Sequence, residues 1–256
     1  MPTWDSEVYK QFTDQRTRPA VDLAARVALD APARVVDLGC GPGNSTAVLA
    51  RRWPRAELTG IDSSPMMLAA ARAAYPERHW VEADIAAWTT DRPLDVVFSN
   101  ASLQWVADHP RIFPRLLEQV APGGALAVQV PANFDAPPHR AMRNIARSAA
   151  WQNRFTSAPR EWHVHPTEFY YDVLAPHARQ LDIWTTEYLH LLAGVDEIVE
   201  WYRGTGLRPW LEALASETDR EQFVYDFRSV IAQEFQPRPD GDVLFPFRRL
   251  FLVAYR

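Results

Sequence analysis

Cysteine and lysine are almost missing from this chain of 256 residues. Cys40 is the only cysteine, so no internal disulfide can form, and the chain suits a reducing compartment such as the cytoplasm. Lys10 is the only lysine among 27 basic residues, and the other 26 are arginines. Any anion that the protein binds is therefore expected to meet a planar guanidinium group, which grips carboxylates bidentately.

Long apolar runs are missing as well. No stretch approaches the roughly 20 residues of a membrane span, and the N-terminus has no apolar core of a signal peptide. The net charge of −5 argues against a nucleic-acid partner. A hydrophobic content of 47%, without repeats or low-complexity tracts, is typical of a globular domain. We expect one domain over residues 1–256, and the oligomeric state stays open, a monomer included.

A strand, a glycine turn and a helix start are present at residues 35–44. An apolar run includes Asp37, and glycines then occupy every second position from Gly39 to Gly43. Such glycines permit unusual backbone angles and let a ligand approach the main chain. A dinucleotide fingerprint needs a glycine at the sixth position, which is Asn44 here. The turn therefore favours a nucleotide ligand without a diphosphate, and an NAD(P)-dependent oxidoreductase is only a remote alternative.

Polar side chains follow the next three apolar runs. The runs that begin at positions 57, 79 and 94 lead to Asp62, to Asp84 with Ile85, and to Asn100. The carboxyl ends of parallel strands meet at one edge of an open α/β sheet, where ligands bind. Asp62 comes roughly 20 residues after the glycine turn, where an acid accepts hydrogen bonds from both ribose hydroxyls. The sequence thus predicts a nucleoside site at this edge.

Strands and helices alternate through the first half of the chain, which predicts a parallel, doubly wound sheet. We expect helices at about 19–30, 44–53, 64–75 and 109–121, and a fifth strand at 125–130. Beyond it we expect a helix at 136–156, an irregular segment at 157–177, a sixth strand at 181–191, helices at 195–203, 208–215 and 217–235, and a last strand at 245–255.

The pattern Asp37-x-Gly39-x-Gly41-x-Gly43, with the polar strand ends that follow, resembles the class I S-adenosylmethionine-dependent methyltransferases. The resemblance implies a Rossmann-like α/β sheet of seven strands, with the last strand antiparallel and inserted between the fifth and sixth. It implies S-adenosyl-L-methionine as methyl donor and S-adenosyl-L-homocysteine as product. It also implies the roles of the cofactor-binding residues: Asp37, Gly39 and Gly41 for the methionine part, Asp62 and Ser63 for the ribose, Asp84 and Ile85 for the adenine, and Asn100 near the sulfonium.

A closer resemblance, over nearly the whole length, is to members of that family that methylate a small tricarboxylate. It is carried by residues 16–20, 37–46, 60–65, 82–85, 100–105, 170–172, 182–184 and 205–210. The last three segments lie outside the shared cofactor fold, so they concern the acceptor. The implied reaction is methyl transfer to a carboxylate oxygen. A carboxylate with a pKa near 4 is ionised at neutral pH, so no general base and no catalytic side chain beyond positioning are expected.

Two segments are expected to form a lid over the acceptor. They are residues 157–177 and 195–236, beside an N-terminal cap at 1–20 and a cofactor-binding core at 31–131. Alternation in the last strand turns one of Arg248 and Arg249 inward, and Arg249 is preferred. The residues expected to bind the acceptor are arginines that clamp the non-reacting carboxylates and aromatic side chains that wall the pocket: Arg16, Arg18, Arg208 and Arg249, with Trp105, Tyr170 and Tyr171.

Three alternatives stay open at this stage. The acceptor could be another small carboxylic acid or a carrier-bound acyl carboxylate. A nicotinamide-dependent dehydrogenase belongs to a different reaction class, and a non-catalytic S-adenosylmethionine sensor to a third. No metal site is expected, since His163 and His165 have no third ligand at metal-binding spacing. Cys40 is interpreted as a small residue of the turn and not as a nucleophile.

Overall fold

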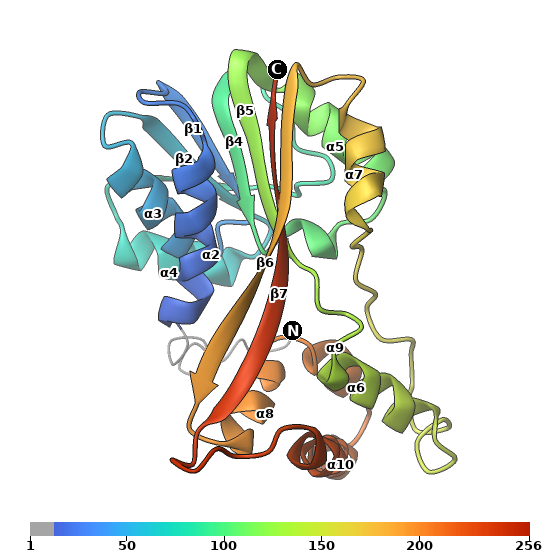
Figure 1. Ribbon diagram of the computed structural model, residues 1–256. Coiled ribbons are helices and arrows are strands. Elements are labelled where there is room, and N and C mark those ends of the chain that lie inside the picture. The colour runs from blue at the N-terminus through green and yellow to red at the C-terminus, as the bar shows by residue number, and fades with distance from the viewer. Residues whose placement is uncertain (1–12) are drawn as a thin grey trace. The chain divides into compact units, whose positions relative to one another are not determined.

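The computed structural model describes residues 13–256, and its backbone contacts divide the chain into two compact units (Figure 1). The larger unit contains residues 14–131, 162–186 and 249–256, and the smaller contains residues 132–161 and 187–248. The expected lid segment at 157–177 is shared between them, because residues 157–161 belong to the smaller unit. The interpretation as a single domain with lid segments stays a prediction.

One mixed sheet has the strand order β3-β2-β1-β4-β5-β7-β6. The strands are β1 (Arg34–Leu38), β2 (Glu57–Asp62), β3 (His79–Glu82), β4 (Leu94–Asn100), β5 (Val120–Pro131), β6 (Gln180–Leu192) and β7 (Val243–Tyr255). Strands β1 to β5 pair in parallel, whereas β7 runs antiparallel to β5 from Ala125↔Tyr255 to Pro131↔Arg249. The predicted seven-stranded sheet, with its last strand between the fifth and sixth, is confirmed.

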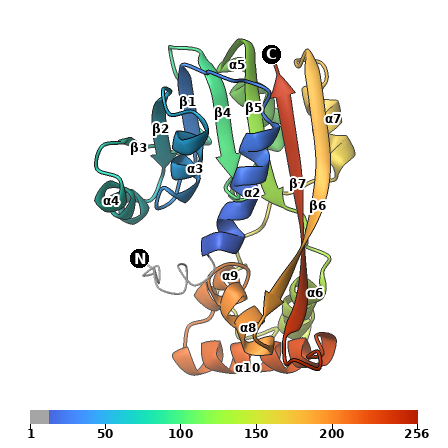
Figure 2. The ribbon, with the colours of Figure 1, turned by 60° about the vertical axis from the view of Figure 1, so that its left-hand side comes forward.

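Helices cover both faces of the sheet in the larger unit. These elements are α2 (Thr13–Arg26), α3 (Asn44–Arg52), α4 (Pro65–Ala74), the 3-10 helix η1 (Leu103–Trp105), α5 (His109–Glu118) and α7 (Thr167–Leu174). Helices α2 and α3 lie in front of the sheet in Figure 2, and α5 lies behind it. The start of α4 is explained by the local sequence, because the Ser64 side chain accepts the Met67 N–H and Pro65 occupies the first turn.

The structure corrects two expectations in this unit. The segment at 157–177 is not irregular throughout, because residues 167–174 form α7. Tyr170 and Leu174 lie four residues apart and are both fully buried, so the helix is stabilised by packing that local sequence does not reveal. Helix α2 begins at Thr13 and contains Pro19 in its interior, whereas the sequence had suggested a start at the proline.

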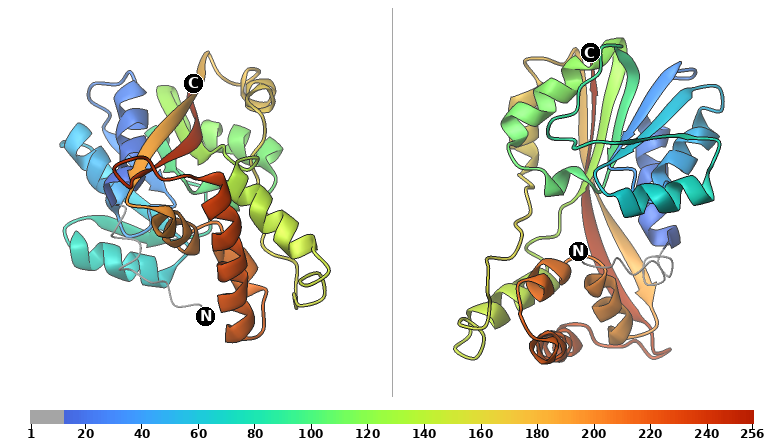
Figure 3. Two further views of the ribbon diagram at one scale, coloured as in Figure 1. Left: turned by 60° about the horizontal axis from the view of Figure 1, so that its bottom comes forward. Right: turned by 180° about the vertical axis from the view of Figure 1, so that it is seen from behind.

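The smaller unit is a helical cluster with an aromatic core. Its helices are α6 (Pro137–Arg147), α8 (Val195–Arg203), α9 (Arg208–Glu212) and α10 (Glu217–Glu234). Helix α10 packs on α6 and α8, and Figure 3 shows it beside α6. The core includes Trp201, Tyr202, Phe223 and Phe227, and α6 ends at Arg147, well before the expected position 156. Among residues 13–256, no helix is both long and apolar enough to cross a membrane.

Candidate active site

The glycine turn joins β1 to α3 and is packed on one side and open on the other. The φ angles of Gly39, Gly41 and Gly43 are 70°, 53° and 93°, a region that favours glycine. A Cβ atom on Gly39 would lie 1.8 Å from Ser102 Oγ, just beyond β4. A Cβ atom on Gly41 would meet nothing within 4 Å in residues 13–256. The open side at Gly41 is where a ligand can approach the main chain.

Asp37 supports this turn from inside the larger unit. Its carboxylate is fully buried, and Oδ2 accepts hydrogen bonds of 2.6 Å from the hydroxyls of both Ser45 and Thr46 at the start of α3. Burial raises the pKa of Asp37 to about 6, the two hydroxyls oppose that shift, and the nearby charge of Asp62 adds to it. Asp37 Oδ1 is buried and has no hydrogen-bond partner among the described residues.

The raised pKa of Asp37 predicts a pH-dependent stability. Below about pH 4 the carboxyl is protonated in both the folded and unfolded states, and stability is lost as the pH rises through the folded pKa near 6. The loss is on the order of 3 kcal/mol, because each pKa unit corresponds to about 1.4 kcal/mol. Asp37→Asn should remove this loss, so the ligand-free variant loses less unfolding free energy between about pH 4 and pH 8 than the wild type.

Urea denaturation across this pH range measures the effect. Asp95→Asn is the matched control, because Asp95 also accepts two hydrogen bonds through one carboxylate oxygen, from the backbone N–H groups of Ala33 and Arg34, but is partly exposed. The prediction fails if Asp37→Asn and wild type show parallel pH profiles.

Cys40 is buried within the turn beside Trp80 and Leu68. Burial, followed by the charges of Asp37 and Asp62, raises the pKa of its thiol far above the ordinary value. A thiol that stays protonated is no nucleophile at neutral pH, which agrees with its interpretation as a small residue of the turn.

Asp62, at the end of β2, anchors the glycine turn, and its contact with the ribose stays a prediction. Its Oδ2 accepts the Gly41 N–H at 2.9 Å, and its Oδ1 accepts the Ser64 N–H at 2.8 Å. A carboxylate offers about four lone-pair positions, so two remain for ribose hydroxyls. Ser63 beside it is exposed. The sequence predicted the ribose contact and missed the anchoring of Gly41.

The ends of β3 and β4 bring the remaining predicted cofactor residues to the same unit. Asp84 is exposed, and its Oδ1 accepts the Ala86 N–H at 2.9 Å. Ile85 is buried, with Cδ1 3.4 Å from the position of a Cβ on Gly39, so it adjoins the turn. Asn100 ends β4, and its Oδ1 is buried without a partner in the described part of the chain.

Trp105 lies in η1, directly after this strand end. Its ring packs on Trp162, with ring centroids 3.9 Å apart and an interplanar angle of 33°. A backbone hydrogen bond joins the same two segments, because the His163 N–H, next to Trp162, donates to Gln104 O, next to Trp105, at 2.8 Å. Trp162 could not be predicted as the partner of Trp105, because no local pattern links residues 57 positions apart. Trp105 as a wall of the acceptor pocket stays a prediction.

Tyr170 is fully buried, and its hydroxyl group connects three segments. The hydroxyl lies 3.0 Å from His109 Nδ1 in α5 and accepts the His165 N–H at 3.2 Å. His109 Nε2 lies 3.0 Å from Leu103 O, so this nitrogen carries the proton and Nδ1 accepts from Tyr170. Burial lowers the pKa of His109, the hydrogen bond to Leu103 O opposes that shift, and the charges of His165 and His163 add to it. Tyr170 thus braces η1, while Tyr171 is 58% exposed.

Tyr170→Phe should lower the free energy of unfolding by about 2 kcal/mol, because His109 Nδ1 and the His165 N–H lose their partner in a buried place. Tyr171→Phe is the matched control and should change it by less than about 0.5 kcal/mol, since Tyr171 is exposed. Denaturant titration of both variants measures the difference, and equal stabilities would show that the hydroxyl network contributes nothing.

The candidate arginines are distributed over both units. Arg249 in β7 is 4% exposed and donates to Gln129 Oε1 at 3.4 Å, whereas Arg248 is exposed, so the predicted alternation is confirmed. Arg208 starts α9 in the smaller unit, and its Nε donates to Glu212 Oε1 at 2.6 Å. Arg18 is exposed on α2, and the side chain of Arg16 lies outside the described part of the chain. Their contact with the acceptor stays a prediction.

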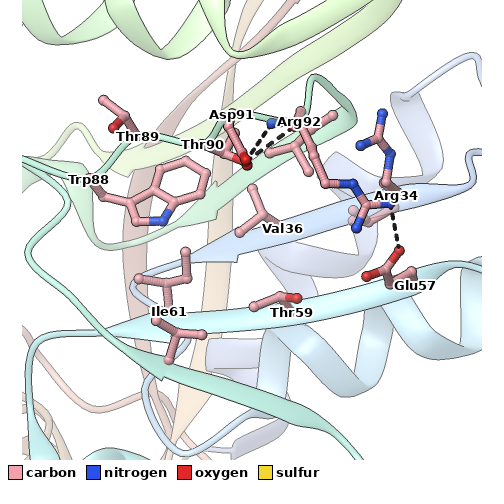
Figure 4. Close-up of a pocket in the computed structure, with 13 residues that line it drawn as sticks. Arg34, Val36, Glu57, Thr59, Ile61, Trp88, Thr89, Thr90, Asp91 and Arg92 are labelled. Carbon is pink, nitrogen blue, oxygen red and sulfur yellow. Dashed lines mark hydrogen bonds and ion pairs between the residues drawn. The ribbon is translucent and has the colours of Figure 1, made fainter.

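A pocket of about 450 Å³ lies elsewhere in the larger unit (Figure 4). Val36, Thr59 and Ile61 line it, under Trp88 of the helix-free connection between β3 and β4. Alternate side chains of a strand point to opposite faces, so Val36 and its register partner Thr59 lie on the face opposite Asp37. None of the residues predicted from the sequence lines this pocket, so it is not the candidate site.

The edge of the sheet at the glycine turn fits the expected donor. Two buried acceptor atoms, Asp37 Oδ1 and Asn100 Oδ1, have no partner among the described residues. The space at Gly41 is open to a ligand, and Asp62 has free lone pairs. Buried polar atoms are normally hydrogen-bonded, so these two are suited to a polar ligand that carries a positive charge.

Comparison with known proteins identifies the family of this chain. Residues 35–124 match the family model of a methyltransferase domain. The chain is 50% identical to the trans-aconitate 2-methyltransferase of Azoarcus sp. (strain BH72) over 256 residues, which are 100% of both chains. It is 46% identical to the trans-aconitate 2-methyltransferase of Yersinia pestis (strain Pestoides F), over 100% of this chain and 99% of that one.

Solved structures of lower identity share the fold. The YcgJ protein of Bacillus subtilis aligns with a TM-score of 0.61 at 12% identity, covering 93% of this chain and 99% of that one. Phosphoethanolamine N-methyltransferase 2 of Haemonchus contortus, solved with S-adenosyl-L-methionine, aligns with a TM-score of 0.58 at 15% identity, over 93% of this chain and 52% of that one. The full-length identities decide the family: the chain belongs to the trans-aconitate 2-methyltransferases, a family of class I S-adenosylmethionine-dependent methyltransferases.

Proposed function

We propose that this protein transfers a methyl group from S-adenosyl-L-methionine to a carboxylate oxygen of trans-aconitate and so forms a monomethyl ester. One observation carries the proposal. The methyltransferase domain model matches only residues 35–124, whereas the relatives named trans-aconitate 2-methyltransferase match the whole chain at 46–50% identity. The similarity therefore extends through the segments outside the cofactor core, which are the segments expected to select the acceptor.

The donor site would use the polar strand ends around the glycine turn. Asp37, Gly39 and Gly41 would hold the methionine part, and Asp62 with Ser63 would hold the ribose. Asp84 and Ile85 would recognise the adenine, and Asn100 would lie near the sulfonium. When bound, S-adenosylmethionine supplies an electrophilic methyl group. The buried Oδ1 atoms of Asp37 and Asn100 support this assignment, because both lack a partner in the described structure.

The acceptor needs orientation and not deprotonation. Its carboxylates are ionised at neutral pH, so no side chain has to remove a proton. The chain would contribute by aligning one carboxylate oxygen and by excluding the water that solvates it. Arg16, Arg18, Arg208 and Arg249 would hold the carboxylates that do not react.

Trp105, Tyr170 and Tyr171 would form the walls of the acceptor pocket, in the case of Tyr170 by bracing η1 through His109. We expect the enzyme to act in the cytoplasm, where the free thiol of Cys40 stays reduced.

A methyl-transfer assay with labelled S-adenosylmethionine and a panel of di- and tricarboxylates tests the proposal. We expect the highest kcat/KM with trans-aconitate and lower values with cis-aconitate, isocitrate and dicarboxylates. A higher kcat/KM with another acid or with a carrier-bound acyl carboxylate would show that this compound, and not trans-aconitate, is the acceptor. Binding of S-adenosylmethionine without turnover of any acceptor would favour a sensor, and tight binding of NAD(P)H instead would favour an oxidoreductase.

A further inference from the structure

Three neighbouring strands of the larger unit carry a row of buried polar side chains. Asn100 ends β4, Gln129 lies in β5, and Arg249 lies in β7. Gln129 is 0% exposed and Arg249 is 4% exposed. Burying an amide or a guanidinium group costs free energy unless the group is hydrogen-bonded, so the partners of each buried group have to be identified. Gln129 was not singled out by the sequence analysis.

The orientation of the Gln129 amide is determined by its neighbour. Arg249 Nη1 donates to Gln129 Oε1 at 3.4 Å. A guanidinium group has no acceptor, so the amide oxygen, and not the amide nitrogen, must face Arg249. The two N–H donors of Nε2 therefore point elsewhere, and Nε2 is buried without a partner among the described residues. Gln129 thus presents a buried hydrogen-bond donor that residues 13–256 do not use.

This donor lies beside the predicted position of the methyl group. Gln129 and Asn100 are register partners in adjacent parallel strands, and the Ala101 N–H donates to Gln129 O at 2.9 Å. Register partners point to the same face of the sheet, so the two side chains share a face. The side chains do not satisfy each other, because Asn100 Oδ1 is also without a partner. Both remain available at the edge that holds the donor's sulfonium under the proposed function.

We propose that Gln129 is a specificity-determining residue that recognises a non-reacting carboxylate of the acceptor through Nε2, while its Oε1 orients Arg249. The proposal rests on the function proposed above. The ligand class follows from the chemistry: the two N–H donors of Nε2, beside the positive charge of a guanidinium group, are suited to an anionic oxygen such as that of a carboxylate. Because an amide cannot accept the proton of an acid, Gln129 selects and positions the acceptor without acting as a base.

Two substitutions of Gln129 test this role. Gln129→Met keeps the length of the side chain but removes both the donor and the acceptor. Gln129→Glu keeps the contact with Arg249 but replaces the donor by a negative charge that repels a carboxylate. Gln119→Met is the matched control, because the partly buried Gln119 at the end of α5 also uses its side-chain amide in hydrogen bonds, accepting the Thr90 N–H and donating to Arg115 O.

The measurements are the acceptor KM, kcat, the S-adenosylmethionine Kd by calorimetry, and the midpoint of urea denaturation. Gln129→Met should raise the acceptor KM about tenfold. Gln129→Glu should raise it about 100-fold or more, because it adds repulsion to the lost donor. The S-adenosylmethionine Kd should stay within about twofold in both variants, and Gln119→Met should leave the acceptor KM unchanged.

Two results would overturn the inference while the wild type methylates trans-aconitate: an unchanged acceptor KM in Gln129→Met, or a rise in the S-adenosylmethionine Kd that matches the rise in acceptor KM. The second result would mean that Gln129 supports Asn100 and not the acceptor. If the wild type methylates a different carboxylic acid, the proposed acceptor is wrong, and the same variants test Gln129 with that acid. If it methylates no carboxylic acid, both proposals fall.

Discussion

Gly41→Ala should lower the affinity for S-adenosylmethionine about 100-fold while it costs only about 1–2 kcal/mol of folding stability. The φ angle of Gly41 is 53°, which any side chain adopts at a cost, but a Cβ atom there meets no atom of the described residues within 4 Å. The added methyl group would instead occupy the open side of the turn, where the ligand approaches the main chain. Calorimetric titration with S-adenosylmethionine and urea denaturation measure the two effects separately.

Gly123→Ala is the matched control for this experiment. Gly123 lies within β5, has a φ angle of 82°, and also has nothing within 4 Å of a Cβ position in the part of the chain that the structure describes. The Gly123→Ala variant should lose a similar amount of folding stability and keep its affinity for S-adenosylmethionine unchanged. Gly39→Ala should damage both properties, because its Cβ would lie 1.8 Å from Ser102 Oγ. Equal affinities of the Gly41→Ala and Gly123→Ala variants for S-adenosylmethionine would show that the open side of the turn does not bind the donor.

Arg208→Ala should raise the KM for trans-aconitate about 100-fold and leave the affinity for S-adenosylmethionine within about twofold. A guanidinium group grips a carboxylate through two parallel hydrogen bonds, which an ammonium group cannot reproduce. Arg208→Lys should therefore recover only part of the loss. One partner of Arg208 is Glu212, four residues along the same helix, at 2.6 Å. Such partly exposed pairs contribute only about 0.5 kcal/mol, so an acceptor carboxylate can replace Glu212.

The control for Arg208 is Arg228→Ala. Arg228 belongs to the same unit, is exposed, and also pairs with a carboxylate, that of Asp196, through Nε at 2.5 Å. Steady-state kinetics of both variants should show a raised acceptor KM only for Arg208→Ala. Unaltered kinetics would remove Arg208 from the acceptor site, and equal losses in both variants would indicate a general effect on the smaller unit.

Much of the fold could be predicted from local signals. The apolar runs, the glycine turn and the Pro65 helix start gave β1 to β4 and helices α3 to α5 within a few residues. The regions that could not be predicted depend on distant partners. Helix α7 forms because Tyr170 and Leu174 are buried against other segments, and the Trp105–Trp162 contact joins residues 57 positions apart. Neither contact has a signal in the local sequence.

The candidate site divides in the same way. The strand ends Asp37, Asp62, Asp84 and Asn100 could be placed from the sequence, because parallel strands that follow one another must end at one edge. Asp62 also accepts a hydrogen bond from the Gly41 N–H, and this contact can be recognised only once β1 and β2 are paired. The role of Tyr170 as a brace appears only when α7 meets α5 through the contact with His109.

By itself, the sequence determined the family of the chain and the chemistry available to it: a glycine turn with acids at the strand ends, and arginines for anions. Those properties belong to single residues and short spacings, so they can be identified before folding. Only the tertiary structure decided which polar atoms are left without partners. Asp37 Oδ1, Asn100 Oδ1 and Gln129 Nε2 became candidates because burial removed water from each of them and the fold supplied no replacement.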